Sequence, residues 1–209
     1  MESNWATENL QVIRTLMERS ALYRRALAPM LLAAGGLGVV AGLAGWQMKI
    51  MAGRPFLYFW LAVGAVAVAL SFFLVRRQAL KDSEPIWSGP TRRVAHAMVP
   101  AIGVGAVFSL IACGVGPEHG YWVERLLPPI WMILYGLAAH SAGFFMERGI
   151  RLLGIIFVLA GVITLGVYGV SREFLETASG HLLMGGSFGL LHLLCGVYLY
   201  FTEKGKSST

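Results

Sequence analysis

Histidine is the residue type in the apolar part of this sequence that could do chemistry, because a neutral imidazole donates and accepts hydrogen bonds and also ligates metals. His181 and His192 lie in the stretch GHLLMGGSFGLLHLLCG, residues 180–196. Eleven steps of about 100° return to nearly the same face of an α-helix, three turns further along. We therefore expect the two rings to share a face but to lie at depths about 16 Å apart, so that no single metal or haem bridges them.

His140 is a further histidine within a long apolar run, and we place its depth within about 5 Å of that of His192 by counting helical residues. Two imidazoles at matching depth on facing helices could hold a haem, and a small-ligand or proton-linked site is another alternative. The favoured interpretation is that both rings are neutral and hydrogen-bonded across a helical bundle, to Ser109, Ser141, Ser187 or backbone carbonyls. His192 and His140 are thus the ligand or cofactor candidates, with haem as the alternative.

Other catalytic and metal-binding patterns are missing from the sequence. Cys113 and Cys195 lie in different apolar runs without a CxxC spacing, no HExxH occurs, and no Asp, Glu, Lys or Arg lies in the middle of an expected span. Ion-coupled transporters and intramembrane hydrolases usually need a carboxylate at depth. We therefore predict no metal site and no catalytic residue, and we interpret the chain as non-enzymatic.

The composition places these residues in a membrane. Hydrophobic residues make up 56% of the chain and charged residues 13%, with a mean hydropathy of +0.66, whereas soluble domains carry about 25% charged residues. The formal net charge of +6 does not indicate nucleic-acid binding, because the basic residues flank the apolar runs. The expected partner is the lipid bilayer and not a nucleic acid.

Apolar segments long enough to cross a hydrocarbon core of about 30 Å as helices occur six times. They cover residues 27–48, 56–75, 95–115, 127–146, 150–170 and 181–202. Thirteen of the 17 Lys and Arg residues lie on the side that holds both termini, which the positive-inside rule places in the cytoplasm. We predict an all-α fold, a polytopic bundle of six transmembrane helices in a cell (inner) membrane, with both termini cytoplasmic.

An amphipathic element precedes the first span. The expected parts of the chain are a cytoplasmic leader at 1–25, the transmembrane domain at 26–203 and a cytoplasmic tail at 204–209. Leu10, Ile13 and Met17 recur on one side of the leader at helical spacing. We predict a helix that lies against the membrane or the bundle, and whose apolar side is an interaction face for a protein partner.

Small residues recur at four-residue spacing on the first and last expected spans. They are Gly38 and Gly42 on the first span, and Gly185 and Gly189 on the last. Such faces let helix backbones approach closely, which favours association in lipid. We predict that these four glycines pack helices together, within the chain or in a homo-oligomer.

Three segments of the chain resemble an uncharacterised family of small bacterial six-helix integral membrane proteins. They read IRTLMERSALYRRALAPMLLAAGGLGVVAG, LLPPIWMILYGLAAHSAG and GSFGLLHLLCGVYLYF. The matching positions are Arg14, Met17, Glu18 and Arg19 in an IR-x-x-MER leader, Trp131, Tyr135 and Gly136 in the fourth helix, and Gly189 and His192 in a G-F-G-x-x-H last helix. This chain departs from the last motif at Ser187, which precedes the phenylalanine. The resemblance implies a bacterial inner-membrane location and the six-helix fold, and it implies no reaction and no ligand.

The expected role is that of a multi-pass membrane protein that acts through helix packing or through partners at its cytoplasmic face. A haem-binding or redox protein that uses His140 and His192 is one alternative. A carrier of a small neutral or lipid-like solute is another, because the glycine-rich spans carry no charge, and such a carrier needs a cavity at mid-membrane.

Overall fold

The computed structural model describes residues 26–81, 83, 85, 87–114, 116, 120–146, 148–171 and 179–206, and its regular structure there is entirely helical. The first five long helices are Ala26–Gln47, α2 (Arg54–Lys81), α3 (Gly89–Cys113), α4 (Gly120–Ala142) and α5 (Arg148–Val170). The last long helix is continuous but changes type, from α7 (Gly180–Met184) through the π-helix η2 (Gly185–Leu191) to α8 (His192–Lys206). The all-α prediction is confirmed for the described residues.

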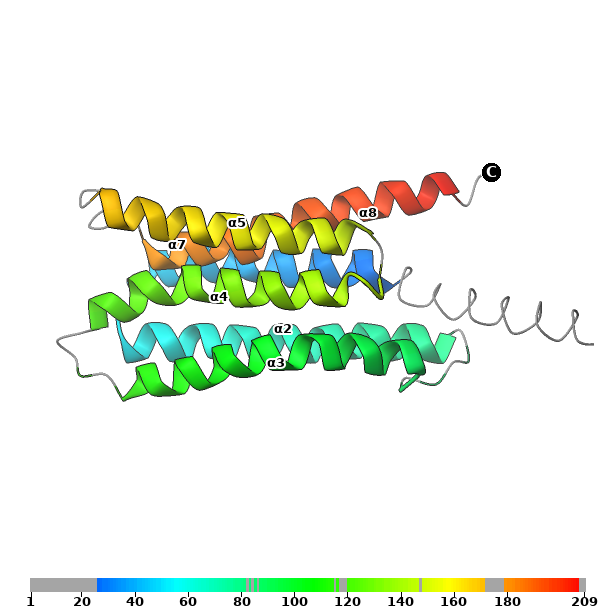
Figure 1. Cartoon of the computed structure of the whole chain (residues 1–209), viewed down its shortest axis with the longest axis horizontal. Coiled ribbons are helices and arrows are strands. Elements are labelled where there is room, and N and C mark those ends of the chain that lie inside the picture. The colour runs from blue at the N-terminus through cyan, green and yellow to red at the C-terminus, as the bar shows by residue number, and fades with distance from the viewer. Residues whose placement is uncertain are drawn as a thin grey trace, which may run out of the picture.

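The helices lie side by side along the long axis of the molecule (Figure 1). The α2–α3 hairpin lies on one side, α4 lies in the middle, and α5 and α8 lie on the opposite side. α4 packs against α3 and α5 and also contacts α2 and α7. The start of the first described helix and the end of α8 lie at the same end of the bundle, which we call the chain-terminal end (Figure 1). The other end is the distal end.

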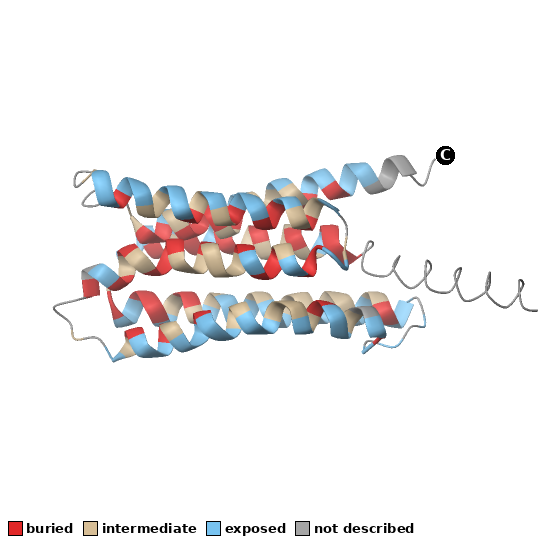
Figure 2. Ribbon diagram, viewed as in Figure 1, coloured by how far each residue is buried: buried red, intermediate tan, exposed pale blue. Residues whose placement is uncertain are grey.

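The outer surface of the bundle is apolar. Burial is concentrated where the helices face one another, while the outward faces of α2, α3, α5 and α8 are exposed (Figure 2). Large exposed apolar side chains on these faces include Val66, Val68, Phe72, Phe73, Val104, Val107, Leu110, Ile111, Leu159, Val162, Ile163, Leu190, Leu194, Val197 and Phe201. A water-soluble monomer rarely exposes apolar patches of this extent, so the surface is that of a protein in contact with lipid.

Five of the described helices are long and apolar enough to cross a membrane. They are Ala26–Gln47, Arg54–Lys81, Thr91–Cys113, Arg148–Val170 and Gly180–Thr202. Each coincides with an expected span, and the five together are those of a helical membrane protein. The remaining long helix, α4, is not among them.

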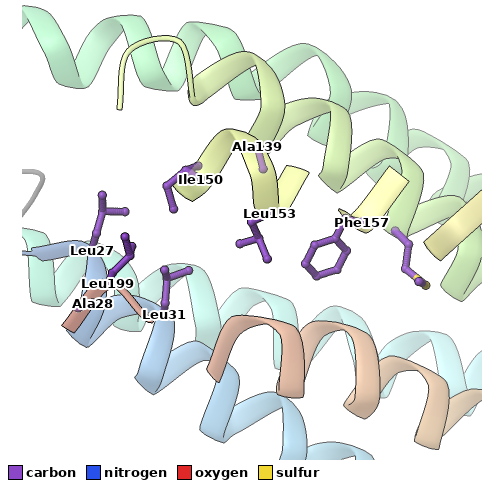
Figure 3. Close-up of a cluster of buried hydrophobic side chains, with 9 residues drawn as sticks. Leu27, Ala28, Leu31, Ala139, Ile150, Leu153, Phe157 and Leu199 are labelled. Atoms are coloured by element: carbon purple, nitrogen blue, oxygen red, sulfur yellow. The ribbon is translucent and has the colours of Figure 1, made fainter. Parts of the chain in front are cut away.

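Two clusters of buried apolar side chains lie inside the bundle. The first cluster joins Ala26–Gln47 to α4, α5 and α8 (Figure 3), through Leu27, Ala28, Leu31, Met132, Ala139, Ile150, Leu153, Phe157 and Leu199. The second joins it to α2, α3, α4 and α7, through Ala41, Phe56, Leu57, Trp60, Ala112, Val123, Leu127 and Met184. Ala26–Gln47 and α4 contribute to both clusters.

The start of α4 differs from the expected boundary. The helix begins at Gly120, seven residues before the expected position 127, so Glu124 and Arg125 lie in its first turns instead of in a loop. Arg125 is only 6% exposed. Hydropathy alone placed the boundary after the charged pair, but a charged side chain can lie within a helix where protein, and not lipid, surrounds it.

Candidate functional site

His192 forms a buried polar pair with a tyrosine of another helix. It is the first residue of α8 and is 5% exposed. Its Nε2 atom lies 2.6 Å from the Tyr135 hydroxyl on α4. The rings of Phe157 and Phe188 surround the pair, and the centroids of the four rings are 5.0–6.2 Å apart. In such apolar surroundings the hydrogen bond links α4 to α8 without competition from water.

The π-helix directly before His192 determines which way this ring faces. A π-helix has i→i+5 hydrogen bonds and about 4.4 residues per turn, so each residue rotates roughly 18° less than in an α-helix. Over the seven residues of η2, the lag adds up to roughly 126°, which is somewhat more than the rotation of about 100° of one α-helical residue. His192 consequently contacts α4 and α5, whereas His181 contacts α2. The prediction that the two histidines share a face is wrong because it assumed a regular α-helix.

His140 lies in a different neighbourhood. Its Nδ1 atom is 3.5 Å from the Arg151 carbonyl oxygen on α5, and its ring packs edge-on against Phe144 with centroids 5.3 Å apart. His140 follows Tyr135 by five residues, which is about 7.5 Å along the helix and roughly 140° around it. The two candidate histidines therefore take part in separate contacts. Because the Nε2 atom of His192 is bonded to Tyr135, this arrangement does not fit a bis-histidine haem without rearrangement.

The serines expected to hold the histidines have other partners. The Trp131 indole N–H donates to Ser109 Oγ at 2.9 Å, and Ser109 in turn donates to the Gly105 carbonyl at 2.9 Å. Ser187 donates to the Leu183 carbonyl of its own helix at 2.7 Å. The partners of His192 and Ser109 are thus Tyr135 and Trp131, two aromatic residues that carry one polar atom each.

The four glycines singled out in the sequence lie where the first and last described helices cross. A Cβ atom added to Gly38 would be 2.9 Å from the Gly189 Cα, and one added to Gly42 would be 2.7 Å from the Gly185 Cα. Side chains larger than hydrogen cannot occupy these positions without separating the backbones. Because the crossing is internal, these glycines do not present a surface to a second copy of the chain.

A second glycine contact, between α4 and α5, was not anticipated from the sequence. A Cβ added to Gly136 would lie 2.7 Å from the Gly154 carbonyl oxygen, and one added to Gly161 would lie 2.8 Å from the Pro129 carbonyl oxygen. The signal was available, because Gly154 and Gly161 are seven residues apart and so recur on one helix face.

His181 is the centre of a hydrogen-bonded network at the distal end. The ring is 2% exposed. The Trp60 indole N–H donates to Nδ1 at 3.2 Å, so the ring proton lies on Nε2, which donates to the Ile50 carbonyl at 3.3 Å. Gly45 packs directly against the ring, where a Cβ would collide. The sequence did not reveal Trp60 of α2 as the partner of this ring.

The end of the first described helix positions the carbonyl that His181 uses. The Ile50 N–H bonds the Gly45 carbonyl at 3.1 Å, and the Lys49 N–H bonds the Trp46 carbonyl at 3.2 Å. These bonds form a Schellman motif, in which the residue after the C-cap adopts a left-handed conformation. That residue is Lys49, with φ of 51°, at a position that usually holds glycine.

Several predicted residues lie apart from these contacts. Cys113 and Cys195 are free thiols. Leu10, Ile13 and Met17 lie outside the described residues. Within the part of the chain that the structure describes, no group of three or more His, Cys, Asp and Glu side chains could hold a metal ion.

Comparisons with known proteins found no relative of the chain. No family model matches the sequence, and neither the curated proteins nor the solved structures contain a significant match.

Proposed function

We propose that this chain is a multi-pass integral membrane protein that crosses the bilayer six times, with both termini in the cytoplasm, and that it acts without catalysis, through helix packing and a protein partner. The observation that carries the proposal is the apolar outer surface of a helical bundle whose first described helix starts, and whose last helix ends, at one end (Figure 1). An even number of crossings returns the chain to the side on which it started.

The sixth crossing in this proposal is α4. Its sequence contains proline, tryptophan, tyrosine and histidine, and α4 is not among the five helices whose hydropathy qualifies them as candidate spans. A helix that lies between other helices does not need an apolar outer face, because protein replaces lipid around it. The contacts of α4 with α2, α3, α5 and α7 support this position.

Charge supports the orientation. Cationic side chains at the chain-terminal end, in the described parts of the α2–α3 and α4–α5 hairpins, are Arg76, Arg77, Lys81, Arg92, Arg93, Arg148 and Arg151. Those described at the distal end are Lys49, Arg54 and Arg125. The positive-inside rule then assigns the chain-terminal end to the cytoplasm. Location in a bacterial inner membrane, and membership of the six-helix family, rest on the resemblance of the three sequence segments.

The partner is proposed to bind the leader, through Leu10, Ile13 and Met17. Replacement of all three by Ser removes the apolar side of the expected amphipathic helix and leaves the spans untouched. The variant is expected to resist extraction from membranes by alkaline carbonate, as the wild type does, and to lose the proteins that co-purify with the wild type. Retention of every co-purifying protein by the triple variant would exclude the leader as the interaction face.

Haem binding through His140 and His192 has weaker support, because the two side chains take part in separate contacts. A Soret band in protein purified after haem-replete expression, lost in His192→Leu, would favour that alternative. A solute carrier would need a cavity at mid-membrane, where Tyr135, Phe157, Phe188 and His192 are in ring contact.

A further inference from the structure

The distal end of the bundle contains an open hollow of about 550 Å³, whose lining includes Trp46, Lys49, Glu124, Ser179 and His181. It lies between the end of the first described helix, the first turns of α4 and the start of α7. Its volume falls in the range of about 300–1,000 Å³ that is usual for small-molecule sites. Charged and polar side chains of three separate segments thus converge on one space.

Two opposite charges line this hollow without neutralising each other. Among the described residues, no ion pair joins Lys49 to Glu124. Glu124 uses one carboxylate oxygen, Oε1, to accept the Gly180 N–H at 3.1 Å. A carboxylate has two oxygens and about four acceptor sites, so Glu124 keeps acceptor capacity. Its negative charge is held in place by a backbone contact.

The backbone holds the positive charge in place as well. Lys49 has a left-handed backbone conformation, which is unfavourable for an L-residue, and the Schellman motif around it fixes the start of its side chain. Glycine would end the helix without that cost. Lysine at this position adds a cationic side chain to the residues that line the hollow, which glycine could not.

The remaining lining favours a cationic group next to Glu124. Trp46 contributes an indole, the best aromatic partner for an ammonium ion. Both His181 nitrogens are already hydrogen-bonded, one to Trp60 and one to Ile50. His181 therefore offers a ligand no further hydrogen bond, and the charged contacts come from Lys49 and Glu124.

We propose that this hollow binds a small zwitterionic unit, with its ammonium group against Glu124 and Trp46 and its anionic group against Lys49. Soluble amino compounds and the head group of an ethanolamine phospholipid share this chemistry. The hollow lies at the end of a lipid-exposed bundle, where either source can reach it.

The test uses the full chain in a non-ionic maltoside micelle, with phosphoethanolamine as the soluble probe. Calorimetric titration is expected to give saturable binding that is at least tenfold weaker for inorganic phosphate alone and for ethanolamine alone. Glu124→Gln removes the charge but keeps an oxygen for the Gly180 N–H. Lys49→Met keeps the side-chain length and the same backbone cost. Each variant should weaken phosphoethanolamine binding at least tenfold, while Lys81→Met, at the opposite end of the bundle, should not change it.

A second experiment distinguishes a lipid head group from a soluble amino compound as the ligand. The micelles are supplemented with phosphatidylethanolamine or with phosphatidylglycerol, and the thermal unfolding midpoint is measured. A rise with phosphatidylethanolamine alone, lost in the Lys49→Met/Glu124→Gln double variant, identifies a lipid head group as the ligand even if the soluble probe does not bind. Absence of an effect in both arms, equal binding of inorganic phosphate, or undiminished binding by both variants would overturn the proposal.

Discussion

His192 and His181 each connect helices that are far apart in the sequence, through an aromatic residue that carries one polar atom. His192 meets Tyr135 of α4, and His181 meets Trp60 of α2 and the Ile50 carbonyl. Between helices in a membrane, such hydrogen bonds are worth about 0.6–2 kcal/mol each. At the residue scale, the histidines therefore stabilise the fold.

Replacement of Tyr135 by Phe is expected to lower stability by about 1–2 kcal/mol, because it leaves the buried Nε2 atom of His192 without this partner. The midpoint of thermal unfolding in maltoside micelles should fall by about 2–6 °C. His192→Leu added to Tyr135→Phe should cost less than the sum of the two single changes, since both remove the same bond.

Tyr198→Phe is the matched control, because Tyr198 lies on α8 and is 59% exposed. It should leave the midpoint unchanged. If Tyr135→Phe were as stable as the wild type, or if the two changes at the pair were simply additive, the Tyr135–His192 bond would not be a link between helices.

Sequence reasoning recognised the histidines as the polar residues that needed partners, but it did not find the partners. Ser109, Ser141 and Ser187 were the expected ones because serine is the usual small hydrogen-bonding residue in membrane helices. Tyr135 and Trp60 come from helices that only the three-dimensional packing brings to the histidines. A tyrosine in the middle of an apolar run was the available signal, since its hydroxyl must be satisfied in lipid or protein.

At the scale of elements, the crossing of the first and last described helices requires glycine at Gly42. Gly42→Ala should destabilise the protein by about 1–3 kcal/mol, because the added Cβ would meet the Gly185 Cα at 2.7 Å. Gly36→Ala, six residues earlier on the same helix, meets nothing within 4 Å. It should be neutral or stabilise the helix by up to about 1 kcal/mol. Unfolding midpoints of the two variants measure the difference, and equal midpoints would refute the close crossing.

The π-helix η2 leads to a second prediction, about the effect of deleting one of its residues. Because η2 lags by roughly the rotation of one residue, deletion of Gly186 should restore α-helical bonding and keep His192 facing Tyr135. Stability should then stay within about 1 kcal/mol of the wild type.

Insertion of one alanine after Gly186 is the matched change in the opposite direction. It should turn His192 away by about 100° and lower the unfolding midpoint at least as far as Tyr135→Phe does. A deletion that is more damaging than the insertion would contradict the account of the π-helix.

The apolar runs were sufficient to place the five helices that could span a membrane, because their length and hydropathy are properties of local sequence. The start of α4 and the π-helix were not predictable in the same way. The first depends on the packing of the first turns of α4, where Arg125 is buried. The π-helix depends on the crossing at Gly185 and Gly189, where packing against the first described helix constrains the backbone.

For the whole molecule, large apolar side chains cover the outer surface as well as filling the two buried clusters, and close glycine contacts and a few polar pairs join the helices. Because other helices surround α4, it does not need the apolar outer face of the five candidate spans. We propose that α4 also crosses the membrane, which makes the number of crossings even.

Labelling of single cysteines with a membrane-impermeant maleimide tests this claim most directly, in a background with Cys113→Ala and Cys195→Ala. Cysteines replace Lys49 and Gly116 at the distal end, and Ser83 and Phe145 at the chain-terminal end. We predict that Lys49→Cys and Gly116→Cys are labelled in intact cells, and that Ser83→Cys and Phe145→Cys are labelled only after the membrane is permeabilised. Labelling of Gly116→Cys and Phe145→Cys from the same side would show that α4 does not cross, and the six-span account would be wrong.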